Sequence, residues 1–192
     1  MLHIKLFPAE YGDCIILSIG KESQYNILID GGLSKTYHKY IKAEIQHIKE
    51  LGQKIGLMVC THMDNDHICG LIQVLKGTNF NFIENVWYNG FLQIVNSRFY
   101  SQKENIFTEK DNKILDEIIS QGMLLDVDQE VGINEGMSLG LLIEERRIPL
   151  NSAARGQAIC SELVKNKYEI APSIFITILG PVSYTHLRAH ET

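Results

Sequence analysis

The sequence lacks any apolar run long enough to cross a membrane. Within its 192 residues no stretch approaches the roughly 20 consecutive apolar residues that a transmembrane helix needs. Residues 1–5 also lack the basic segment and following apolar stretch that mark a secretory signal peptide. We therefore expect a cytoplasmic protein with no membrane partner.

The sequence also lacks a strong charge of either sign and any Cys-x-x-Cys pair. The formal net charge is -5, so nothing indicates a broad basic surface, and a nucleic-acid substrate would have to be held by local patches or by metal ions. The four cysteines are widely spaced and mostly lie in apolar runs, which predicts buried thiols. Cys69 stands beside the motif described next, where it could be a metal ligand, although packing in a helix core is favoured.

What the sequence does contain is a dense cluster of potential metal ligands. His62, Asp64, Asp66 and His67 fall within six residues, directly after the apolar run 55–60, which indicates a short buried strand. A loop at the end of a strand can aim these side chains at one point, and Asp66 could also cap a helix that continues to Gly77. Imidazole and carboxylate are ligands for zinc, manganese and iron, and this spacing supplies donors for two neighbouring ions.

The alternative for this cluster is a polar turn with two surface histidines. We favour a metal site, because ligand types packed this closely rarely serve a turn alone. Two other histidines, His38 and His47, lie on or beside an amphipathic pattern and lack neighbouring donors, so we expect them to face solvent.

The motif resembles the His-x-His-x-Asp-His signature of the metallo-β-lactamase fold, in the variant in which the second histidine is aspartate, here Asp64. That variant is similar to the hydrolase-like domain of competence-type DNA-uptake proteins and their stand-alone relatives. Two upstream segments stand in the order of the same family: residues 11–17, which open a strand, and residues 27–32, where a strand ends in Asp30 before two glycines. The resemblance covers residues 1–75 well and the remainder loosely.

The resemblance implies an α/β protein with an αββα sandwich whose second sheet is incomplete. It implies that His62, Asp64, Asp66 and His67 bind two divalent ions, zinc or else manganese, and that Asp66 also orients the attacking water. Asp30, which by sequence alone could be an ordinary turn aspartate, would support the metal loop through hydrogen bonds.

The function implied is that of a metal-dependent hydrolase, with a small-molecule or nucleic-acid phosphodiester, or a related ester, as the favoured substrate. The alternative is a module that keeps the fold to bind a partner or a nucleotide and does not turn substrate over, since one fold can host many functions. The oligomeric state is left open.

Periodicity and turn-forming residues predict the remaining elements. Expected strands lie at residues 3–7, 14–19, 25–29, 82–88, 123–127, 137–143 and 173–179, and expected helices at 37–51, 112–119 and 151–165. Residues 93–112 are polar and weakly periodic, which indicates a surface insertion or lid. Trp87 and Tyr88 could line a cleft, but aromatic residues in a strand are more often core.

The last segment, residues 182–192, shares no pattern with the rest of the chain. Residue for residue, it matches one reading frame of a transposase mosaic-end sequencing adapter, so we expect residues 1–181 to be the N-terminal portion of a single domain and the tail to be non-native. His186 and His190 are therefore discounted as ligands. The later aspartate and histidine that complete the two-metal site in the resembled family are absent before residue 182, so we expect this chain to bind metal weakly and to hydrolyse essentially nothing.

Overall fold

The computed structural model describes residues 1–21, 24–90, 93, 132–164 and 167–180. The helix predicted at 112–119, the strand predicted at 123–127 and the adapter-like tail lie outside these residues, as does the predicted insertion apart from residue 93. Within the described parts, none of the helices is both long enough and apolar enough to cross a membrane.

A five-stranded sheet of mixed direction organises the fold. Its strands lie in chain order, with β1, β2 and β3 antiparallel and β3, β4 and β5 parallel. The bounds are β1 (Leu2–Leu6), β2 (Ile15–Ile19), β3 (Tyr25–Ile29), β4 (Ile55–Cys60) and β5 (Val86–Tyr88). Four of these strands agree with the predicted positions. The fifth is shorter than predicted, because Thr78–Phe82 forms a 3-10 helix, η2, and leaves only three residues to pair with β4.

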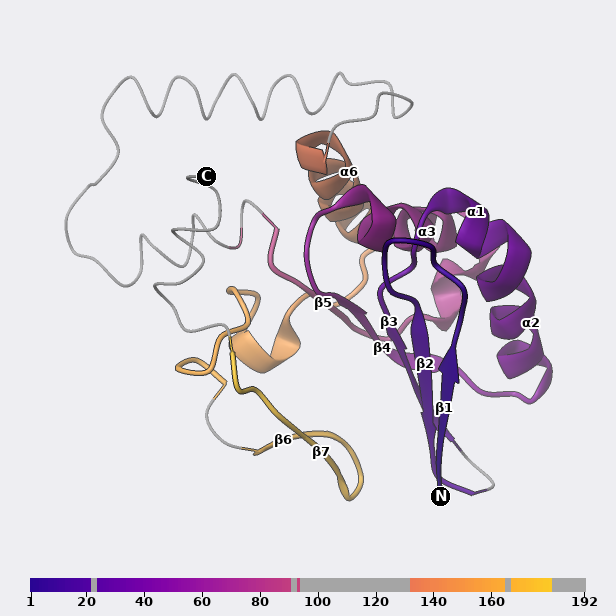
Figure 1. The fold of residues 1–192 in the computed structure, drawn as a ribbon. Coiled ribbons are helices and arrows are strands. Elements are labelled where there is room, and N and C mark those ends of the chain that lie inside the picture. The colour runs from indigo at the N-terminus through magenta and orange to yellow at the C-terminus, as the bar shows by residue number, and fades with distance from the viewer. Residues whose placement is uncertain (22–23, 91–92, 94–131, 165–166, 181–192) are drawn as a thin grey trace, which may run out of the picture.

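Helices cover one face of the sheet and supply most of the core (Figure 1). They are α1 (Ser34–Thr36), the π-helical turn η1 (Tyr37–Ile41), α2 (Lys42–Glu50), α3 (Asn65–Lys76) and α6 (Gly132–Glu145). The helix predicted at 37–51 is confirmed but begins at Ser34, and Gly52 ends it with a left-handed φ of 68°. Leu51, the last residue of the predicted helix, is 54% exposed.

Two predicted elements are wrong. Residues 137–143 form part of α6 rather than a strand, and their buried positions, Leu139 and Ile143, are four residues apart as a helix requires. The helix predicted at 151–165 is only the short 3-10 helix η3 (Ser152–Ala154), because Asn151 and Arg155 take left-handed backbone conformations that a right-handed helix cannot include.

The opposite face of the sheet carries a two-stranded hairpin (Figure 1). Strands β6 (Lys167–Ala171) and β7 (Ile174–Thr177) pair antiparallel, and their apolar side chains pack toward Ile27, Leu57 and Trp87. Strand β7 agrees with the strand predicted at 173–179, whereas β6 was not predicted. A largely apolar cavity of about 540 Å³ separates the hairpin from the sheet. The described residues thus form an α/β structure with helices on one face of a mixed sheet.

The side chains singled out from sequence are placed as follows. Trp87 and Tyr88 are buried, 5% and 2% exposed, as the core assignment predicts, and both also line the cavity between the hairpin and the sheet. His38 and His47 are exposed, as predicted. Cys14, Cys60 and Cys160 are buried thiols, and Cys69 is half-buried against the core that the helices form.

Candidate metal centre

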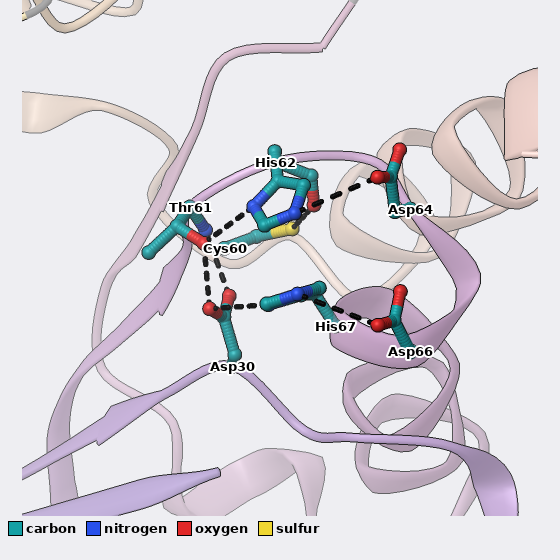
Figure 2. A network of polar contacts seen from close by, with 7 residues as sticks. All are labelled: Asp30, Cys60, Thr61, His62, Asp64, Asp66 and His67. Atoms are coloured by element: carbon teal, nitrogen blue, oxygen red, sulfur yellow. Dashed lines mark hydrogen bonds and ion pairs between the residues drawn. The ribbon is translucent and has the colours of Figure 1, made fainter. Parts of the chain in front are cut away.

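The candidate ligands lie at the C-terminal ends of the two neighbouring parallel strands β3 and β4 (Figure 2). Asp30 directly follows β3, and its N–H donates to the carbonyl of Val59 at 2.9 Å, so the two strand ends are held in register. Residues 61–64 then connect β4 to α3. Parallel pairing therefore brings Asp30 beside a loop more than thirty residues away in the chain.

Asp30 accepts three hydrogen bonds although it is only 1% exposed. Its Oδ1 accepts from the N–H of Thr61 at 2.8 Å, and its Oδ2 accepts from Thr61 Oγ1 at 2.6 Å. The same Oδ2 lies 2.9 Å from Nδ1 of His67, the first buried side chain of α3. A left-handed φ of 52°, which aspartate tolerates better than most residues, gives the carboxylate this position. Asp30 thus ties together the ends of β3, β4 and α3.

These hydrogen bonds determine which ring nitrogen of each histidine carries a hydrogen when the ring has only one. The ionised carboxylate of Asp30 can only accept, so Nδ1 of His67 carries the hydrogen. The hydroxyl of Thr61 gives its one hydrogen to Asp30, so over the 2.9 Å to Nδ1 of His62 it can only accept. In that form both rings have the lone pair on Nε2, the atom that would bind a metal. A metal-binding histidine usually donates its other ring N–H in this way.

Each Nε2 atom faces a carboxylate. His62 Nε2 lies 3.7 Å from Asp64 Oδ2, and His67 Nε2 lies 3.7 Å from Asp66 Oδ2. Figure 2 shows both carboxylates on one side of the two rings, with Asp30 and Thr61 on the other. Two ligands of a tetrahedral zinc ion, each about 2.0–2.2 Å from it, lie about 3.3–3.6 Å apart, so small side-chain movements would let each pair share an ion. The ring centroids are 3.7 Å apart, which makes the two pairs neighbours.

A tighter grouping of donors is formed by Asp30, His62 and His67, whose candidate ligand atoms all lie within 4.8 Å of one another. A search of the described residues finds this one group of three or more histidine, cysteine, aspartate or glutamate side chains. We assign Asp30 to holding the ligands in place, because both of its oxygens already accept hydrogen bonds. Asp64 and Asp66 lie outside the group, each beside one histidine.

The position of Asp66 corrects one detail of the sequence interpretation. The N-cap of α3 is Asp64, in extended conformation, whereas Asp66 lies in the first turn of the helix. The side chain of Asp64 makes no capping hydrogen bond and is 76% exposed. Neither carboxylate is therefore committed to the helix end, and each can turn toward a metal. The acidic first turn is also favoured by the positive end of the helix dipole.

Close backbone contacts hold the start of α3 against the loop after β3, and the two glycines that follow Asp30 take part in them. Gly31 N–H donates to His67 O at 2.7 Å, and Gly70 N–H donates to Gly32 O at 2.9 Å. A Cβ at Gly70 would collide with the carbonyl of Gly31, and one at Gly12 would collide with the carbonyl of Asp66. Only glycine permits these approaches. In the sequence, Gly12, Gly31 and Gly70 each stand in or next to one of the three segments on which the family resemblance depends.

Cys60 lies at the base of the site without being a suitable ligand. Its thiol donates to the carbonyl of His62 at 3.1 Å. Burial raises the pKa of Cys60 well above its usual range, and the nearby carboxylate of Asp30 raises it further, so the group stays a thiol. The thiolate is the form that binds metal.

No protein-family model matches this chain, and no curated protein matches it either. The functional interpretation therefore depends on the residues and on their geometry.

Proposed function

We propose that this chain belongs to a metal-dependent hydrolase of metallo-β-lactamase type, which acts on a phosphodiester or a related ester. The observation that carries the proposal is the arrangement of His62 and His67. Each ring is held through Nδ1, and each presents Nε2 to a carboxylate 3.7 Å away. A metal-binding histidine is usually oriented through its other ring nitrogen, and both rings follow this pattern.

The surroundings of the site also support metal binding. The loop stands at the carboxyl ends of parallel strands, where ligands commonly bind in open α/β sheets. His67 is 7% exposed whereas Asp64 is largely exposed, so the site is anchored at its base and open toward solvent. Each donor pair leaves coordination positions unfilled, as catalytic rather than closed structural sites do.

In the proposed reaction the protein side chains mainly hold the metal ligands and orient the attacking water. Asp30 and Thr61 hold both imidazoles through Nδ1, and Asp66, whose side chain is 26% exposed, would accept a hydrogen bond from the attacking water. Divalent ions, when bound, would acidify that water and offset the charge that develops on the ester oxygens.

Metal binding is the first test. Purified protein is dialysed against Zn²⁺ or Mn²⁺, and the bound metal per chain is measured by elemental analysis. We expect His62→Ala and His67→Ala to lower the bound metal, because each removes an oriented Nε2 donor. His38→Ala is the matched control, because that ring is exposed on η1 and should leave the metal content unchanged. Equal metal content in all four proteins would refute the proposed site.

Hydrolysis is the second test. Metal-dependent turnover of bis-p-nitrophenyl phosphate is compared for wild type and Asp66→Asn, each against a metal blank. Because we expect the 192-residue chain to be nearly inactive, the same pair is made in the reading frame recovered from intact genomic DNA. Turnover that Asp66→Asn abolishes would support the hydrolase. Metal binding through His62 and His67 with no turnover of phosphodiesters or other esters in either frame would instead support the non-catalytic binding module.

A further inference from the structure

Helix α6 approaches the metal loop at a glycine. Gly136 is buried, and a Cβ added there would lie 2.8 Å from Oη of Tyr88 and 2.9 Å from Sδ of Met63. Tyr88 Oη donates a hydrogen bond to the carbonyl of Gly136 at 2.8 Å. The same point on α6 therefore contacts the end of β5 through Tyr88 and the loop after β4 through Met63.

Met63 lies between two of the candidate ligands. Its neighbours His62 and Asp64 have side chains that are 49% and 76% exposed, whereas Met63 is half-buried and packs against the core that the helices form. Of these three consecutive residues, Met63 is thus the one whose side chain is packed into the core. Packing of the Met63 side chain against the core restrains the backbone of the loop at this point.

We propose that Gly136 is a positioning residue for the metal loop: the missing Cβ leaves the space in which the sulfur of Met63 sits, and Met63 in turn sets the spacing of His62 and Asp64. This inference rests on the proposed metal site. The hydrogen bond from Tyr88 holds α6 at the height at which Gly136 meets Met63. Residues that support metal ligands from behind typically change affinity by about 10- to 100-fold when they are removed.

A second glycine in the same helix provides a matched control. Gly140 has no atom within 4 Å of the position that a Cβ would take. Alanine is a better helix former than glycine by about 1 kcal/mol, so Gly140→Ala should stabilise α6 without touching the loop. Gly136→Ala gains the same propensity but places a methyl group 2.9 Å from Sδ of Met63 and 2.8 Å from Oη of Tyr88. The two substitutions differ only in what the new methyl group meets.

The experiment measures Zn²⁺ affinity by competition with a chromophoric chelator, together with the melting temperature in EDTA. We expect Gly136→Ala to weaken Zn²⁺ binding about 10-fold, with Gly140→Ala at the wild-type value. Met63→Ala should weaken binding to a similar extent, and the Gly136→Ala/Met63→Ala double variant should be no weaker than either single one, because both remove the same contact. Met63→Leu, which keeps the packed volume, should retain most of the affinity.

Several results would overturn the inference. Equal Zn²⁺ affinities of Gly136→Ala and Gly140→Ala would show that the contact between Gly136 and Met63 does not affect metal binding. Additive losses of affinity in the double variant would show that Met63 and Gly136 act separately. If Tyr88→Phe restores the affinity of Gly136→Ala, the effect passes through the hydroxyl of Tyr88 and not through Met63. Should Gly136→Ala fail to fold, Met63→Ala with normal affinity would overturn the inference by itself. Wild-type protein without His67-dependent Zn²⁺ binding would overturn both this inference and the proposed function, whereas the other results leave the metal site standing.

Discussion

Replacing Asp30 with asparagine tests the central hydrogen-bond network with the smallest possible change. Asparagine has nearly the shape of aspartate and tolerates the left-handed φ of 52° at this position, so the backbone need not move. What changes is that one acceptor oxygen becomes an NH₂ donor. Asp30 is surrounded by three donor groups, the N–H of Thr61, its hydroxyl and Nδ1 of His67, and an amide cannot accept from all of them.

Each orientation of the new amide has a cost that follows from the contacts. With NH₂ in place of Oδ1, it faces the N–H of Thr61 at 2.8 Å, and a buried donor left without an acceptor costs about 1–3 kcal/mol. With NH₂ in place of Oδ2, His67 must accept at Nδ1 and carry its hydrogen on Nε2, which removes the lone pair that binds metal. We therefore expect the free energy of unfolding to fall by about 1–3 kcal/mol.

The Zn²⁺ affinity of Asp30→Asn should fall by about 10- to 100-fold, equivalent to about 1.4–2.7 kcal/mol. Chelator competition measures the affinity, and urea unfolding in EDTA measures the stability. Glu145→Gln removes one carboxylate charge at an exposed site at the end of α6 and controls for net charge. Zn²⁺ affinity of Asp30→Asn within twofold of wild type would refute the argument that Asp30 orients His67.

The remaining predictions concern the helix that the sequence analysis missed and the buried thiols. Leu139→Ala should lower the free energy of unfolding by about 2–5 kcal/mol, because Leu139 is 0% exposed. Leu141→Ala should lower it by about 0.5 kcal/mol or less, because Leu141 is 38% exposed. Equal losses in urea unfolding would favour the predicted strand over α6. Burial raises the pKa of Cys14 to about 12 and that of Cys60 higher still, so both thiols stay protonated at pH 8. Iodoacetamide, which reacts with the thiolate, should therefore label them only after unfolding. Labelling of either cysteine in the native protein at the rate of an unfolded control would contradict this.

Much of the first half of the fold could be predicted from sequence because its signals are local. Short apolar runs bounded by glycine and polar turns indicated β2, β3 and β4, and the spacing of Ile41, Ile45 and Ile48 indicated α2. The cluster from His62 to His67 was visible for the same reason, since its donors are neighbours in the chain. That these donors bind metal and catalyse hydrolysis stays a prediction.

What could not be predicted depends on contacts that are distant in the chain. Residues 137–143 carry apolar side chains interrupted at Ser138 and Gly140, so the alternation of a strand fits as well as the spacing of a helix, and packing against α3 decides for a helix. The role of Thr61 arises only because parallel pairing of β3 and β4 brings it to Asp30. The left-handed conformations of Asn151 and Arg155, which break the helix predicted at 151–165, have no signature in composition.

The closeness of the four donors in sequence has a thermodynamic consequence. His62, Asp64, Asp66 and His67 remain within six residues of one another even when the chain is unfolded, so the denatured ensemble can also chelate metal. A ligand raises the melting temperature only to the extent that it prefers the native state, and binding to the unfolded chain subtracts from that gain. What folding adds is the contact with Asp30, which comes from a distant part of the chain and orients the ring of His67. The rise in melting temperature with zinc should therefore be smaller than the native affinity implies, and the shortfall measures how much of the site is already present in a short unfolded peptide.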